Sequence, residues 1–192
     1  MSKHDLRRKQ GHEDRESVKR TARRILLDLD GTRATATLYD EFAPKTCEAA
    51  WDILPVTGRA IHANWSGREI MLHLEGEKIL RLPQEMKVRS NFVTEGDITY
   101  FYRASQMSRG KQLAYSAQFQ RELSEFAIFY GSPAGEGLSA YDPARTPYKQ
   151  GVHVLNKFAT IDRPIPEEFR LKCETLRHEG LKPLTVSRYS EG

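Results

Sequence analysis

Short stretches in which apolar and polar residues alternate recur along the chain, and this period of two is typical of β-strands. The expected strands cover residues 25–29, 33–39, 60–65, 68–74, 87–93, 97–102, 125–130 and 152–161. Asp30-Gly31 and Ser66-Gly67 are expected to form two-residue hairpin turns, because such turns need residues that tolerate a positive φ. The pattern therefore predicts mostly antiparallel strands.

Two other stretches have the period of a helix. Pro44 suits the first turn of a helix, and apolar residues follow it at the spacing i, i+3, i+4 and i+7, namely Cys47, Ala50, Trp51 and Leu54. A second helix is expected at 167–178, with an apolar side made of Phe169, Cys173 and Leu176. Antiparallel strands with one helix near each end favour a closed β-barrel, since closure removes the exposed edges of a sheet.

The positive charge of the chain lies at its beginning. The 192 residues carry a net charge of +4, but residues 1–24 alone hold nine basic and four acidic residues. The remaining residues are therefore close to neutral, which argues against a body that binds nucleic acid through phosphates. Residues 1–20 have few apolar side chains, so we expect a polar arm there and one barrel domain at 21–192. An arm that reaches a second copy would make a homo-oligomer.

Several classes of protein are excluded by missing patterns. No apolar run is long enough to span a membrane, and the first residues lack the apolar stretch of a signal peptide. Cys47 and Cys173 lie far apart, so we expect reduced thiols in a cytoplasmic protein. The chain has no nucleotide-binding glycine motif and no nucleophile-elbow motif. No cofactor and no metal are predicted.

The expected hairpin around Ser66-Gly67 carries most of the candidate chemistry. A two-residue turn would put Ile61, Ala63, Ile70 and Leu72 on one face of the hairpin. The other face would then hold His62, Asn64, Glu69, Met71 and His73. Two imidazoles and a carboxylate on one face can bind a metal or transfer protons, and the spacing is loosely similar to the first cupin motif. The same residues would also suit a solvated hairpin face.

His62 is the candidate catalytic acid or base. The candidate ligand-binding residues are polar or aromatic side chains at strand ends and turns, namely Trp65, Ser66, Glu69, Asn91, Glu125, Tyr130 and Asn156. Residues 131–151 contain four glycines and three prolines and are expected to form a long loop that covers the site. Packing, turn capping or surface exposure would explain the same residue types without a ligand.

Two groups of motifs carry a family resemblance. Residues 34–54, with Pro44, Lys45 and Thr46 at the helix start, resemble the beginning of the cyclophilin barrel. The stretches 61–70, 95–102, 125–131 and 156–161 resemble an uncharacterised bacterial family with a cyclophilin-like fold, over roughly residues 22–180. This resemblance implies a closed β-barrel with two peripheral helices, and it implies no particular activity.

The chain departs from true cyclophilins at their active-site motif. Ile61-His62-Ala63 stands where cyclophilins have Phe-His-Arg, and no Phe-Met-x-Gln stretch follows. The missing arginine would polarise the prolyl carbonyl, so we expect at most weak prolyl isomerase activity. The sequence therefore predicts a protein that binds or processes a small polar metabolite at the mouth of the barrel, near His62. The alternative is a non-catalytic assembly module that uses the barrel and the basic arm.

Overall fold

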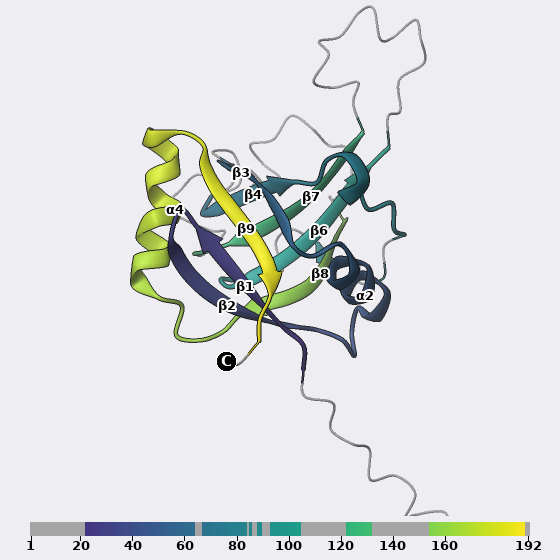
Figure 1. Cartoon of the computed structure of the whole chain (residues 1–192). Helices are drawn as coiled ribbons and strands as arrows, with labels where there is room; N and C mark the ends of the chain where they lie inside the picture. Colours follow the sequence, from purple (N-terminus) through teal and green to yellow (C-terminus); the bar gives the residue numbers. More distant parts are fainter. Residues whose placement is uncertain are drawn as a thin grey trace, which may run out of the picture.

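The computed structural model describes residues 22–63, 67–83, 85, 88–89, 93–104, 122–131 and 154–190 (Figure 1). Its elements, in chain order, are β1 (Arg24–Leu29), β2 (Thr32–Leu38), α2 (Pro44–Ile53), β3 (Val56–His62), β4 (Glu69–His73), η1 (Gly76–Lys78), β5 (Val88–Arg89), β6 (Asp97–Arg103), β7 (Leu123–Phe129), β8 (Val154–Ile161), α4 (Glu167–Glu179) and β9 (Lys182–Arg188). No helix in this part of the chain is long and apolar enough to cross a bilayer.

Eight of the strands form a closed antiparallel barrel. Their order is β2-β1-β9-β3-β4-β7-β6-β8, and a pairing between β8 and β2 closes the ring. The short strand β5 pairs with the beginning of β8, at Val88↔Leu155 and Arg89↔Val154. The predicted fold class, a mainly β closed barrel with two peripheral helices, is confirmed.

Alternation along the strands places the core inside the barrel. The largest fully buried aliphatic and aromatic side chains on the strands face inward, among them Ile25, Leu27, Leu29, Ile70, Leu72, Ile98, Tyr100, Phe126, Ile128 and Phe158. Full burial of one such side chain contributes about 1.5–3 kcal/mol. The turn between β1 and β2 is the predicted two-residue hairpin, with positive φ values of 51° at Asp30 and 85° at Gly31.

The two helices lie on opposite sides of the barrel (Figure 1). Helix α2 contacts β8, and α4 contacts β1, β2 and β3. Cys47 on α2 and Cys173 on α4 are both buried in the core. Burial raises the pKa of the Cys47 thiol to about 12 and raises the pKa of Cys173 as well, so both thiols stay protonated at neutral pH.

Strand β9 was not predicted, although it lies between β1 and β3 and belongs to the barrel wall. Proline cannot donate a hydrogen bond to a neighbouring strand, so Pro183 argues against a central strand. The structure accommodates Pro183 as the second residue of β9, opposite Arg59, and its carbonyl accepts a hydrogen bond from the N–H of Asp30 at 2.9 Å. Leu184 and Val186 then supply the inward-facing residues of this strand.

Candidate functional site

The pairing of β3 with β4 decides which side of the barrel wall each candidate residue faces. Ile61 pairs with Met71 and His62 pairs with Ile70, while the N–H of Ala63 donates to the carbonyl of Glu69 at 2.9 Å. This register differs by one residue from the register that a two-residue turn at Ser66-Gly67 would give. Because side chains alternate with a period of two, a shift by one residue moves each of them to the other face.

The prediction that His62 shares a face with Glu69, Met71 and His73 is therefore wrong, whereas the last three do lie on one face of β4. His62 is opposite Ile70, whose side chain belongs to the inner core, whereas Met71 belongs to a separate apolar cluster. Asn64, the fifth predicted member of that face, lies outside the described residues. The cupin-like alternative fails for the same reason, since His62 and Glu69 face opposite sides of the wall. Among the residues that the structure describes, no three His, Cys, Asp or Glu side chains gather into a metal-binding set.

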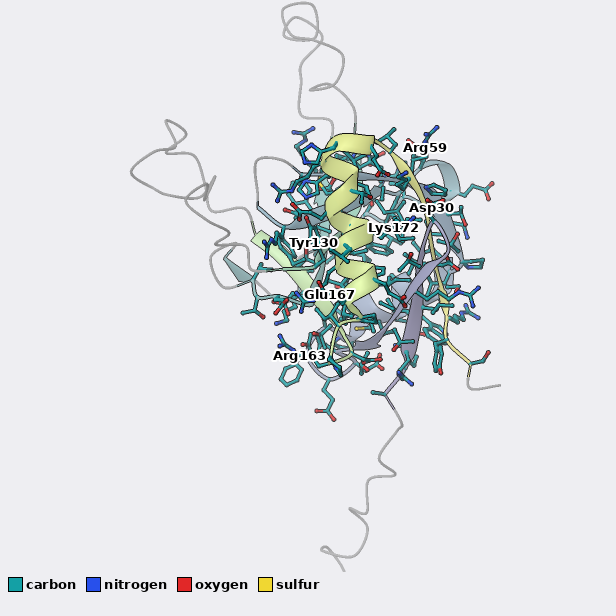
Figure 2. All side chains as sticks on the ribbon, turned by 90° about the vertical axis from the view of Figure 1, so that its left-hand side faces the viewer. Asp30, Arg59, Tyr130, Arg163, Glu167 and Lys172 are labelled. Atoms are coloured by element: carbon teal, nitrogen blue, oxygen red, sulfur yellow. The ribbon has the colours of Figure 1, made fainter. Side chains whose placement is uncertain are left out.

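His62 lies at the end of β3 in a polar cluster with α4. Only 5% of its surface is exposed, and its Nε2 atom lies 2.7 Å from the hydroxyl of Tyr130. The Tyr130 hydroxyl donates to the Glu174 carboxylate at 2.6 Å, and Tyr130 lies beside α4 in Figure 2. Arg177 donates from Nε to His62 Nε2 at 3.1 Å and from its terminal nitrogen to the carbonyl of Gly67 at 3.0 Å. Arg177 and Glu174 also form an ion pair at 2.9 Å.

These contacts already engage Nε2 of His62, one of the two ring nitrogens through which a catalytic imidazole could transfer a proton. Since an arginine N–H can only donate, Nε2 of His62 acts as an acceptor there, and the imidazole could take a proton at this atom only if Arg177 moved away. Burial, and the hydrogen bond to Glu174, raise the pKa of Tyr130, so its phenol stays protonated. We describe the cluster as a tie between α4 and the barrel end, and the catalytic role of His62 stays a prediction.

Asn156 lies away from His62, because its contacts are with α2 and the segment at Pro83 and Glu85, whereas those of His62 are with α4. It is 1% exposed, and its oxygen accepts the N–H of Glu85 at 2.9 Å. Its amide nitrogen donates to the carbonyl of Pro83 at 3.3 Å and lies 3.4 Å from the hydroxyl of Thr46. These contacts fasten the segment around Pro83 and Glu85 to α2 and β8. The structure therefore does not bring Asn156 together with the other candidates.

The outer surface of β4, β7 and β6 carries an apolar cluster of its own. We call it the Ala127 face and define it by the outward-facing residues Glu69, Met71, His73, Thr99, Phe101, Glu125, Ala127 and Phe129. Met71, Ala127 and Thr99 form a row across the three strands. Ala127 has the shortest side chain of the face. Ala63 packs in the same cluster.

Three buried polar side chains accompany this apolar cluster. Glu69 is 7% exposed and Glu125 is 8% exposed. Glu125 lies 3.4 Å from Nε2 of His73, and this contact raises the pKa of His73. Thr99 is fully buried, and its hydroxyl has no hydrogen-bond partner within the described part of the chain. The face therefore combines apolar contact area and two carboxylates with one hydroxyl that has no hydrogen-bond partner within the described part of the chain.

Comparison with known proteins places the chain in a family. A family model matches residues 25–188, which is most of the chain. The chain belongs to the family described as "Protein of unknown function (DUF3830)". No curated protein matches it.

Solved structures resemble this DUF3830 member in fold. One is described as "Structure of McbB in complex with tryptophan", with a TM-score of 0.55 and 17% identity; the match covers 88% of this chain and 45% of the McbB chain. Another is the solution structure of the hypothetical protein AF2241 from Archaeoglobus fulgidus, with a TM-score of 0.50 and 17% identity, covering 90% of this chain and 99% of that one. The chain thus spans less than half of McbB, and at this identity both likenesses show the shared fold alone.

The candidate residues of this DUF3830 chain fall into three places. His62 and Tyr130 lie together at the α4 end, Glu69 and Glu125 lie on the Ala127 face, and Asn156 lies beside α2. Trp65, Ser66 and Asn91, and nearly all of the loop 131–151, lie outside the described residues.

Sequence reasoning missed Thr99, Phe101, Ala127 and Phe129 as members of a site. The period of two in β7 could have found two of them, since it puts Ala127 and Phe129 on the side of Glu125.

Proposed function

We propose that the protein binds a small organic molecule on the Ala127 face, with an aromatic or aliphatic part against Met71, Ala127 and Phe129. The observation that carries the proposal is the hydroxyl of Thr99, which is fully buried in an apolar cluster without a partner among the described residues. A buried polar group without a hydrogen bond costs about 1–3 kcal/mol. A ligand that donates to or accepts from this hydroxyl would recover that free energy.

The composition of the face favours a ligand with a cationic or N–H-donating group. Glu69 and Glu125 make this part of the face acidic, and a cationic group of a ligand is attracted to such a negative charge. His73 already supplies one partner for Glu125. Phe129 and Phe101 offer aromatic rings, which stack favourably against planar ligands. A small aromatic amine or aromatic amino acid combines these properties.

The comparison with McbB supports this ligand class. McbB has a cyclophilin-like fold and was solved in complex with tryptophan, an aromatic amino acid. A ligand of that kind would find apolar and acidic side chains together on the Ala127 face. In the cyclophilins, the arginine at the position of Ala63 serves isomerisation, so the proposed function here is binding rather than prolyl isomerisation.

Three probes that differ by one group test the proposal. We expect tryptamine and tryptophan to bind the full chain in isothermal titration calorimetry, and 3-ethylindole, which lacks the amine of tryptamine and carries no charge, to bind at least 10-fold more weakly, because it offers no cation to the carboxylates of the face. Equal affinity for 3-ethylindole, or no binding of tryptamine and tryptophan, would overturn the proposal.

Two variants locate the binding on the Ala127 face. Ala127→Leu fills the position of the shortest side chain and should weaken tryptamine binding at least 10-fold, whereas Ala104→Leu, at an exposed position at the end of β6, should leave it unchanged. Thr99→Val removes only the hydroxyl and should weaken binding about 5-fold in a chain that stays folded, because about 1 kcal/mol of hydrogen bonding is lost. Wild-type affinity in Thr99→Val and Ala127→Leu would place the ligand elsewhere.

A further inference from the structure

The wall of the barrel opens where β3 and β4 separate. Strand β3 pairs with β9 along 56–60, but it pairs with β4 only at Ile61 and His62. Beside the unpaired edge of β3 lies a groove of about 390 Å³, lined by β3, by His73, Glu75 and Lys78, and by Leu181. This volume lies within the range of small-molecule sites.

Two cations of this groove have no acidic partner within the described part of the chain. Arg59 is exposed on the outside of the barrel (Figure 2), and within the described residues its guanidinium donates to the carbonyl of Leu181, at 3.5 Å. The ammonium of Lys78 donates to the carbonyl of Ile53 at 2.5 Å. An ammonium has three donors and a guanidinium five, so both groups keep donors for a ligand.

The remaining charges of the groove leave it positive. Glu75 is an exposed carboxylate in the lining, and it opposes one of the two cations. Protonated His73 is balanced by its contact with Glu125 at 3.4 Å. The groove therefore carries about one positive charge that the described chain does not neutralise. Beside these charges, Ile61 is partly buried, and Leu181 is 44% exposed although it is a large apolar side chain.

We propose that this groove is a second binding site, which takes a small monoanionic carboxylate with an apolar body. The carboxylate contacts Arg59 and Lys78, because a guanidinium and an ammonium both donate charge-assisted hydrogen bonds to such a group. The apolar body covers Ile61 and Leu181, whose burial contributes about 25 cal/mol per Å² of apolar surface removed from water. The ligand is opposite in charge to the ligand proposed for the Ala127 face, and this site does not depend on that one.

Benzoate and its uncharged counterpart benzamide test the charge that the groove selects. We expect benzoate to bind the full chain and to shift the amide signals of β3 and of residues 73–78 in ¹H–¹⁵N spectra, with benzamide at least 5-fold weaker. Benzamide binding as tightly as benzoate, or benzoate causing no shifts, would overturn the site.

Variants assign the binding to the two cations. Arg59→Gln and Lys78→Gln should each weaken benzoate binding at least 5-fold, and Arg163→Gln, which changes an exposed arginine bonded to the carbonyl of Glu95, should have no effect. Equal losses in all three variants would mean a general effect of net charge and would contradict the proposal. Thr99→Val should leave benzoate binding intact while it weakens tryptamine binding, so a failure of either site is recognised separately.

Discussion

The polar cluster around His62 and the Ala127 face lie on opposite surfaces of the barrel wall, and both bury polar side chains. In the His62 cluster the chain pairs the polar groups with one another: Tyr130 donates to Glu174, and Arg177 bonds to His62, to Glu174 and to a backbone carbonyl. Such a network fastens α4 to the barrel end. Nε2 of His62, the Tyr130 hydroxyl, the Glu174 carboxylate and the Arg177 guanidinium thus have partners within the protein.

The Ala127 face differs in the hydrogen bonding of its buried polar groups. The Thr99 hydroxyl has no partner within the described residues, although it is fully buried, and the carboxylates of Glu69 and Glu125 lie beside an apolar cluster. Burial of a polar group therefore does not by itself mark a binding site. The distinguishing property is whether the chain already satisfies that group.

The largest expected effect comes from breaking the satisfied network. Arg177→Met removes the donor to His62 Nε2 and to the Gly67 carbonyl, and it leaves Glu174 without its ion pair. We expect the free energy of unfolding in urea to fall by about 1–2 kcal/mol, because the buried Nε2 of His62 loses its donor, whereas the partly exposed Glu174 contributes little. Arg163→Met at an exposed position should change it by less than about 0.5 kcal/mol. An unchanged stability in Arg177→Met would show that the cluster is not a structural tie.

A smaller effect of the opposite sign is expected on the Ala127 face. Thr99→Val removes a buried hydroxyl that the described chain does not satisfy, so the ligand-free protein should become more stable by about 1 kcal/mol in urea denaturation. The same variant should bind tryptamine more weakly. This combination of gained stability and lost binding is typical of a group kept for a ligand. A loss of stability would instead mean that the hydroxyl supports the fold, and the contrast between the two regions would disappear.

The smallest effect concerns His73 at the edge of the Ala127 face. The hydrogen bond to Glu125 holds the pKa of His73 above its ordinary value of 6.5. The stability from this pair is therefore fully present below pH 6.5 and is lost as the pH rises through the raised pKa. Because the side chain of His73 is more than one-third exposed, the step should be less than about 1 kcal/mol.

Thermal unfolding scans between pH 5 and pH 9 measure this step, from about 1.5 pH units below to about 2.5 pH units above the ordinary histidine pKa. His73→Gln should remove it, and His178→Gln, at an exposed position of α4, should keep it. A step that survives in His73→Gln belongs to another group.

Much of the fold could be predicted because its signals are local. The Asp30-Gly31 turn, the strand at 97–103 and the apolar side of the helix at 167–179 each follow from a few neighbouring residues. The strand at 182–188 could not be recognised, since Pro183 and two apolar residues are a weak local signal. It is a strand because β1 and β3 pair with it on both sides.

The fold class of the protein follows from the sequence, because alternating apolar positions and two amphipathic helices specify a mainly β barrel. The sequence also shows that Glu69 and Glu125 are acidic residues within strands. Only the tertiary structure decided which surface each candidate residue faces. One residue of register between β3 and β4 moves His62 inside and Glu69 outside. That register depends on pairing across the barrel and on a connection longer than two residues, which no local pattern of apolar and polar residues encodes.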